Sequence, residues 1–89
     1  MARKRRKLNK DFERKIYSSK KNVELVLAKI YDIDDEDIQK EYMSAFNRVV
    51  YLYDVLKDDY ELQGFCDDSE ELLTNYKNAF NIFESEFEI

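Results

Sequence analysis

The strongest candidate for a metal-binding segment is the run of carboxylates between Asp32 and Asp37, which reads Asp-Ile-Asp-Asp-Glu-Asp. An EF-hand calcium loop needs oxygen ligands at positions 1, 3 and 5, a glycine at position 6 and a glutamate at position 12. A loop that starts at Asp32 meets the first three requirements, but Asp37 stands at position 6 and Met43 at position 12. Because the two most demanding positions fail, the pattern favours a carboxylate-rich helix N-terminus. We expect no metal ion and no other cofactor.

Residue types that build catalytic centres are scarce. The chain has no histidine and a single cysteine, Cys66, so it cannot assemble a structural zinc site or a histidine-activated nucleophile. Its single glycine, Gly64, leaves no glycine-rich loop for a nucleotide phosphate. Pairs among the 20 acidic residues arise easily by chance. We therefore expect no enzymatic activity, and a Cys66 side chain that packs near a helix end.

Positive charge is concentrated at the N-terminus. Residues 1–21 hold ten basic and two acidic residues, a net charge of +8, whereas residues 22–89 hold five basic and 18 acidic residues, a net charge of −13. Residues 1–8 are interpreted as a basic arm, flexible over residues 1–7, that precedes an acidic domain at residues 9–89. Three uses of the arm stay open: contact with nucleic-acid phosphates, nuclear localisation, or a solubilising tail that rests on the acidic body. Its cations are Arg3, Lys4, Arg5, Arg6 and Lys7.

The acidic body is itself a candidate binding surface. Carboxylates at fixed spacing on helices can imitate a phosphate backbone and occupy the groove of a nucleic-acid-binding protein. The alternative is an ordinary solvated surface on an acidic protein. The candidate contacts form three clusters, which are Asp58, Asp59 and Glu61; Asp67, Asp68, Glu70 and Glu71; and Glu84, Glu86 and Glu88.

A narrow apolar stripe runs along the nominally polar side of the central segment. Tyr51, Val55 and Leu62 lie within about 40° of one another on a helical wheel. Either another helix covers this stripe, or it is exposed as a partner-binding site in which the tyrosine serves as an anchor.

Apolar spacing predicts three helices, at residues 9–32, 35–63 and 69–87. In the central helix the main apolar face repeats every three or four residues, as one side of an α-helix does. Asp34 is its expected N-cap and Gly64 its expected left-handed C-cap. The main face consists of Ile38, Tyr42, Ala45, Val49, Leu52, Leu56 and Tyr60, and a flanking set of Met43, Phe46, Val50 and Tyr53 widens it.

The outer helices each show one apolar face. Asn9 is the expected N-cap of the first helix, and a capping box of Asp68 with Glu71, or of Asp67 with Glu70, is expected at the start of the third. The first face contains Phe12, Ile16, Ser19, Val23, Val26, Leu27 and Ile30; the third contains Leu72, Tyr76, Ala79, Phe80, Phe83 and Phe87. Since the chain lacks proline and has one glycine, turn-rich sheets are excluded, and the fold class is all-α, a small up-down-up three-helix bundle.

These features predict a binding protein in the cytoplasm, or in the nucleus of a eukaryotic source. A single cysteine fits a reducing compartment, no run of 18 apolar residues exists, and charged residues occupy the segment where a signal peptide would be apolar. We therefore expect no contact with a membrane.

The leading hypothesis is a small regulator or inhibitor whose acidic helices bind a nucleic-acid-handling protein. The alternatives are an accessory protein tethered to nucleic acid by the basic arm, and a protein of the antitoxin or immunity type. At the level of class, without a shared motif, the size, charge and helix count are similar to those of phage or plasmid inhibitors of nucleic-acid enzymes. A protein partner is expected, and homo-oligomerisation stays open.

Overall fold

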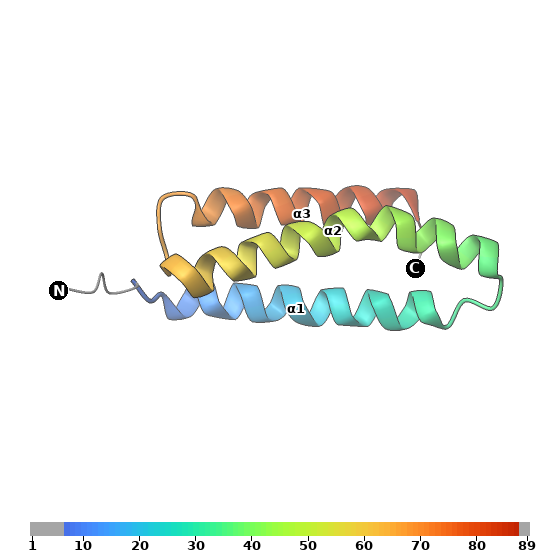
Figure 1. Ribbon diagram of the computed structural model, residues 1–89, viewed down its shortest axis with the longest axis horizontal. Coiled ribbons are helices and arrows are strands. Elements are labelled where there is room, and N and C mark those ends of the chain that lie inside the picture. Colours follow the sequence, from blue (N-terminus) through green and yellow to red (C-terminus); the bar gives the residue numbers. More distant parts are fainter. Residues whose placement is uncertain (1–6, 88–89) are drawn as a thin grey trace.

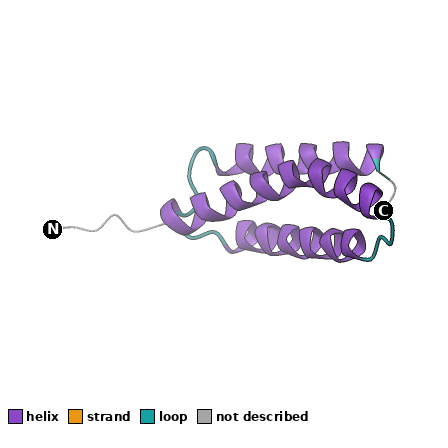
Figure 2. Ribbon diagram, turned by 45° about the vertical axis from the view of Figure 1, so that its right-hand side comes forward, coloured by secondary structure: helices purple, strands orange, loops and turns teal. Residues whose placement is uncertain are grey.

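Three helices joined by short turns run up, down and up along a common axis in the computed structural model (Figures 1 and 2). The helices are α1 (Lys10–Tyr31), α2 (Glu36–Gln63) and α3 (Ser69–Glu86). The structure describes residues 7–87, and this part of the chain contains no strand. The predicted all-α three-helix bundle is therefore confirmed, with helix bounds within one residue of those expected. The expectations for Arg3, Lys4, Arg5, Arg6 and Glu88 lie outside the described residues.

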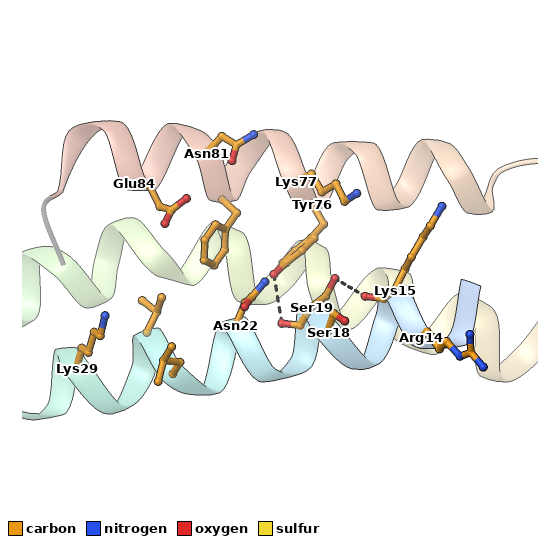
Figure 3. Close-up of a pocket in the computed structure, with 13 residues that line it drawn as sticks. Arg14, Lys15, Ser18, Ser19, Asn22, Lys29, Tyr76, Lys77, Asn81 and Glu84 are labelled. Atoms are coloured by element: carbon orange, nitrogen blue, oxygen red, sulfur yellow. Dashed lines mark hydrogen bonds between the residues drawn. The ribbon is translucent and has the colours of Figure 1, made fainter. Parts of the chain in front are cut away.

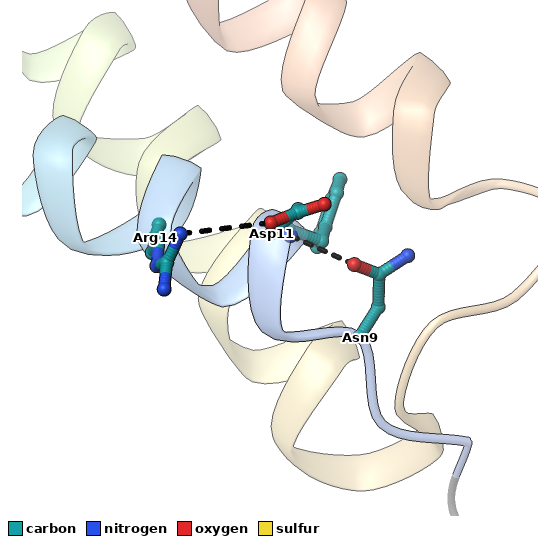
Figure 4. A network of polar contacts seen from close by, with 4 residues as sticks. Asn9, Asp11 and Arg14 are labelled. Carbon is teal, nitrogen blue, oxygen red and sulfur yellow. Dashed lines mark hydrogen bonds and ion pairs between the residues drawn. The ribbon is translucent and has the colours of Figure 1, made fainter.

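Local capping explains where the first two helices begin. Asn9 accepts a hydrogen bond from the N–H of Phe12 at 3.0 Å, as predicted (Figure 4). The N-cap of α2 is Asp35, whose Oδ1 accepts from the N–H groups of Asp37 at 2.9 Å and Ile38 at 3.2 Å. The prediction of Asp34 was therefore wrong by one residue, because several consecutive carboxylates suit a helix N-terminus equally well.

The capping box predicted for α3 is wrong. Asp68 precedes the helix, but its backbone is already in the right-handed helical region and its side chain makes no capping bond. The carboxylate instead accepts a hydrogen bond from the thiol of Cys66 at 2.8 Å.

Gly64 ends α2 with φ of 72°, a left-handed value that glycine adopts without steric cost. The positive φ expected at this glycine is present, but its ψ of −157° lies outside the left-handed helical region, so the predicted left-handed cap is wrong in detail.

The core lies where α2 faces both neighbours. Phe46 and Tyr53, expected at the side of the apolar face, are buried at its centre, whereas Leu52 is only partly buried and Ile38 is 44% exposed. The centre of the face is therefore rotated from the predicted position toward the flanking set. This rotation follows from packing, because the deepest positions on a middle helix are those that point between its two neighbours.

Aromatic side chains of α2 pack against those of α3 and its C-terminal end. The ring of Phe46 lies 4.8 Å from that of Phe83, and the ring of Tyr42 lies 4.8 Å from that of Phe87. At the start of α1 the ring of Phe12 lies 5.7 Å from that of Tyr60, and near its end the backbone oxygen of Ile30 accepts a hydrogen bond from Nε2 of Gln39 at 3.1 Å. Close backbone approaches accordingly join α2 to each neighbour and are most extensive with α3, whereas α1 and α3 stand farther apart.

Candidate functional site

A groove of about 540 Å³ separates α1 from α3 (Figure 3). Its floor contains Tyr76, whose buried hydroxyl donates a hydrogen bond to the backbone oxygen of Ser19 at 3.2 Å. The small Ser19 side chain is itself buried, and its hydroxyl donates to the backbone oxygen of Lys15 at 2.8 Å. Burial raises the pKa of Tyr76 to about 12, so its hydroxyl stays protonated at neutral pH. The hydrogen bond between Tyr76 and Ser19 joins the two helices across the floor of the groove.

The rim of the groove is cationic, although the protein as a whole is acidic. Arg14, Lys15 and Lys29 line it from α1 and Lys77 lines it from α3, while Glu84 is the one acidic residue among the lining residues. Figure 3 shows Lys29 and Glu84 on opposite rims at the same end of the groove. A groove that concentrates four cations on a chain of net charge −5 is a candidate site for an anionic ligand.

The groove cations are largely free of internal carboxylates. In the described range 7–87, Lys15, Lys29 and Lys77 make no ion pair, and Arg14 makes one exposed contact to Asp11 at 3.8 Å (Figure 4). Sequence reasoning missed this site because its cations come from two helices that are distant in the chain. One feature of the sequence could have indicated the site: on α1, polar and cationic residues recur with helical spacing beside the face that forms the core.

The turn between α2 and α3 brings together two of the three predicted acidic clusters. Most of these carboxylates are exposed, and Asp59 is partly buried. The thiol of Cys66 lies 3.7 Å from Oδ2 of Asp59 and 2.8 Å from Oδ1 of Asp68, so it joins the end of α2 to the start of α3. We call this set the acidic turn; it contains Asp58, Asp59, Glu61, Asp67, Asp68, Glu70 and Glu71.

The third acidic cluster lies elsewhere. Glu84 follows Glu71 by 13 residues, which corresponds to about 20 Å along α3. Glu84 lines the α1–α3 groove, and Glu86 is exposed at the last residue of the helix. The predicted acidic residues therefore do not form one continuous surface.

The apolar stripe on α2 is exposed over most of its length. Tyr51 is 65% and Leu62 is 77% exposed, while Val55 is partly buried. Coverage of these two side chains by another helix, one of the two alternatives drawn from the sequence, is thereby ruled out. Asp58 lies seven residues after Tyr51 and four before Leu62, so it shares their face of the helix. At Asp58 the acidic turn therefore meets the face of α2 that carries the stripe.

The basic arm enters the fold beside the acidic turn. The backbone oxygen of Lys7 accepts a hydrogen bond from the N–H of Phe65 at 2.6 Å, which anchors the last residue of the expected flexible segment. Lys7 also lines a hollow of about 330 Å³ with Asp67 and Glu70. At Lys7 the backbone is therefore hydrogen-bonded to the folded domain, and the flexibility expected for residues 1–6 lies outside the described residues.

Three metal-binding atoms meet at the acidic turn. A carboxylate oxygen from each of Asp59 and Asp68 lies within 4.8 Å of the sulfur of Cys66 and of the other carboxylate oxygen. The hydrogen bond to Asp68 raises the pKa of the thiol, although a nearby hydroxyl opposes this shift. A metal ion binds the thiolate and would have to displace that proton. Structural zinc sites also use four ligands, and this set has three. The contacts are accounted for as hydrogen bonds within the turn.

No helix within residues 7–87 combines the length and the apolarity that crossing a membrane requires. Comparison of the chain with protein-family models, with curated proteins and with solved structures gives no match.

Proposed function

We propose that this protein is a small non-enzymatic regulator that binds the nucleic-acid-contacting surface of a partner protein. The contact is made by the acidic turn together with the apolar stripe on α2. The observation that carries the proposal is the exposure of Tyr51 and Leu62 on the face of α2 that also carries Asp58 of the acidic turn.

The apolar stripe can supply binding energy that charged residues alone cannot. A few well-buried side chains in the centre of an interface, with tyrosine among the favoured types, provide most of its binding energy, whereas exposed charges at the rim contribute mainly steering and selectivity. Tyr51 and Leu62 have the exposure that such a centre needs. The carboxylates around them favour a partner surface rich in lysine and arginine.

The local charge density is close to that of a nucleic acid. Asp58 and Glu61 are three residues apart, about 4.5 Å along the helix axis, and Asp59 lies between them. Duplex DNA carries one charge for about every 1.7 Å of its axis. Three carboxylates in this interval give a similar density over one turn of α2. Asp58 and Glu61 are its exposed members, whereas Asp59 is partly buried and accepts a hydrogen bond from Gln63 at 2.9 Å.

The test begins with capture of the partner from a lysate of the source organism, with and without nuclease. The purified partner is then titrated with the parent protein and with two matched double variants at two salt concentrations. Asp58→Lys with Glu70→Lys reverses charge in the acidic turn, and Glu24→Lys with Glu41→Lys reverses the same charge elsewhere. We expect only the first pair to weaken binding, mainly through slower association at low salt.

A third variant and a competition measurement complete the test. Tyr51→Ala with Leu62→Ala should accelerate dissociation without loss of helix content, because both side chains are exposed in the free protein. The parent protein should also displace duplex DNA or RNA from the partner. Equal binding by all variants, or a partner that retains nucleic acid at saturation, would contradict the proposal.

The distribution of charge on α1 favours a second candidate function, tethering to nucleic acid. This helix carries six basic and three acidic residues, a net charge of +3, and it directly follows the basic arm. Deletion of residues 1–6 should then abolish a weak affinity for duplex DNA or RNA that falls steeply with salt. Fluorescence anisotropy over a salt series measures this, and affinity that does not depend on salt would exclude tethering.

A further inference from the structure

We propose that the groove between α1 and α3 is a docking site for an acidic, amphipathic helix of a partner protein. This site is separate from the acidic turn. It is lined by residues of α1 and α3, whereas the proposed regulatory contact uses α2 and the α2–α3 turn.

The geometry of the groove suits a fourth helix that lies along α1 and α3. Both α1 and α3 run antiparallel to α2, so they are parallel to each other, and Figure 3 shows α2 behind them. A helix placed along the open side would complete a four-helix bundle. The parallel course of the two rims favours a rod-shaped occupant.

The residues along the α1 rim have the spacing of a helix-pairing seam. Five of the eight lining positions on α1 are separated by three, four, three and four residues, the repeat with which one helix meets another. This seam consists of Lys15, Ser18, Asn22, Leu25 and Lys29. A helix presents matching side chains at this interval, whereas an extended peptide does not.

The groove has an apolar section with cationic residues before and after it. Leu25 is 59% exposed, lies one turn before Lys29 and is next to the buried Val26, while the partly buried Phe80 lines the groove from α3. Lys29 follows this apolar section on α1, and Arg14 and Lys15 precede it by about three turns. A ligand with an apolar stripe and acidic flanks fits both parts, whereas a nucleic-acid backbone would leave the apolar section without a partner.

The positive charge of the groove indicates that the bound helix should carry negative charge. Four cations face one carboxylate in the groove, and Lys15, Lys29 and Lys77 have no ion pair within residues 7–87. The distance from Lys15 to Lys29 along α1 is about 21 Å, which corresponds to four turns. The occupant is therefore a helix of about four turns with an excess of aspartate or glutamate.

The test uses full-length protein and a fluorescent 18-residue peptide with leucine at intervals of three and four residues and glutamate on both flanks. A peptide of the same composition in scrambled order and a lysine-flanked version serve as controls. We expect the amphipathic acidic peptide to bind at least about tenfold more tightly than either control. In an amide chemical-shift titration, Asn22, Lys77 and Asn81 should then respond. Comparable affinity for the scrambled peptide would overturn the proposal, because no helical face would be recognised.

Matched variants locate the binding site. Lys29→Glu with Lys77→Glu reverses two groove cations, and Lys20→Glu with Lys40→Glu makes the same change in net charge outside the groove. The first pair should weaken peptide binding about tenfold, and the second should change it by less than about twofold. Leu25→Ser should weaken binding without affecting folding, since Leu25 is largely exposed.

Circular dichroism first establishes that each variant keeps the helix content of the parent. Equal losses for the two lysine pairs would mean that the peptide responds to overall charge and would refute the groove as a docking site. Absence of peptide binding, together with binding of a duplex oligonucleotide that depends on Lys29 and Lys77, would assign the groove to nucleic acid instead. Because these variants leave the acidic turn unchanged, failure here is distinguishable from failure of the proposed regulatory function.

Discussion

Replacement of two leucines on α2 by alanine tests which side of this helix forms the core. Leu56 is 1% exposed, whereas Leu52, four residues earlier, is only partly buried. The apolar repeat of the sequence treats the two as equivalent members of one face. Since the substitution and the helix are the same, differences in helix propensity cancel, and the comparison measures burial alone.

The expected losses of unfolding free energy for the two substitutions differ by more than the error of measurement. Removing a fully buried leucine side chain costs about 3–5 kcal/mol, because the lost transfer free energy is added to the cost of the cavity. At Leu52 part of the side chain already contacts water, and solvent can enter the space left behind. We therefore expect Leu52→Ala to cost about 1–2 kcal/mol. In a domain of this size, 1 kcal/mol corresponds to about 4–8 °C in the unfolding midpoint.

Urea unfolding followed by far-UV circular dichroism provides the free energies, with the denaturant slope as a check that both variants unfold as the parent does. The total stability of a domain this long is about 4–13 kcal/mol, so Leu56→Ala removes a large share of it. If Leu56→Ala is unfolded without urea and Leu52→Ala is folded, the expected order still holds. Equal costs at the two positions, or a larger cost at Leu52, would refute the packing of α2 described here.

Three further measurements test individual contacts. Because burial raises the pKa of Tyr76 from 10 to about 12, the neutral phenol stabilises the folded state below pH 10, and this contribution is lost as pH rises to 12. The free energy of unfolding of the parent should therefore fall more steeply over that interval than that of Tyr76→Phe. Asp35→Ala should cost about 1 kcal/mol in urea unfolding, whereas Asp34→Ala should cost almost nothing, because only Asp35 caps α2. Deletion of residues 1–6 should leave the thermal midpoint unchanged, whereas removal of Lys7 as well should lower it, since its backbone oxygen accepts from Phe65.

Much of the fold was predictable because apolar periodicity is a local property. The face of α1, including the small Ser19, packs as its spacing indicates, and Asn9 caps the helix as its residue type suggests. Local signals are ambiguous where several equivalent residues are adjacent. The run that contains Asp34 and Asp35 offers more than one suitable cap, and the backbone conformation of the turn selects between them.

The candidate sites depend more strongly on long-range packing. The acidic turn was partly visible, since its two clusters flank a short connection and must lie close together. The cationic groove was not visible, because Lys29 and Lys77 are 48 residues apart and neither has a cationic neighbour in the sequence. Leu73 and Ser69, both buried, were likewise absent from the predicted face of α3.

The sequence by itself determined the three helices, their approximate ends, the all-α class and the separation of a basic N-terminus from an acidic body. These properties follow from residue type and spacing within one turn or two of helix. Only the tertiary structure decided how α2 is rotated between its neighbours, that Tyr51 and Leu62 stay exposed, and that α1 and α3 stand apart over a cationic groove. The physical reason is that burial depends on which helices approach one another and at what angle, and side-chain packing across the whole bundle sets both.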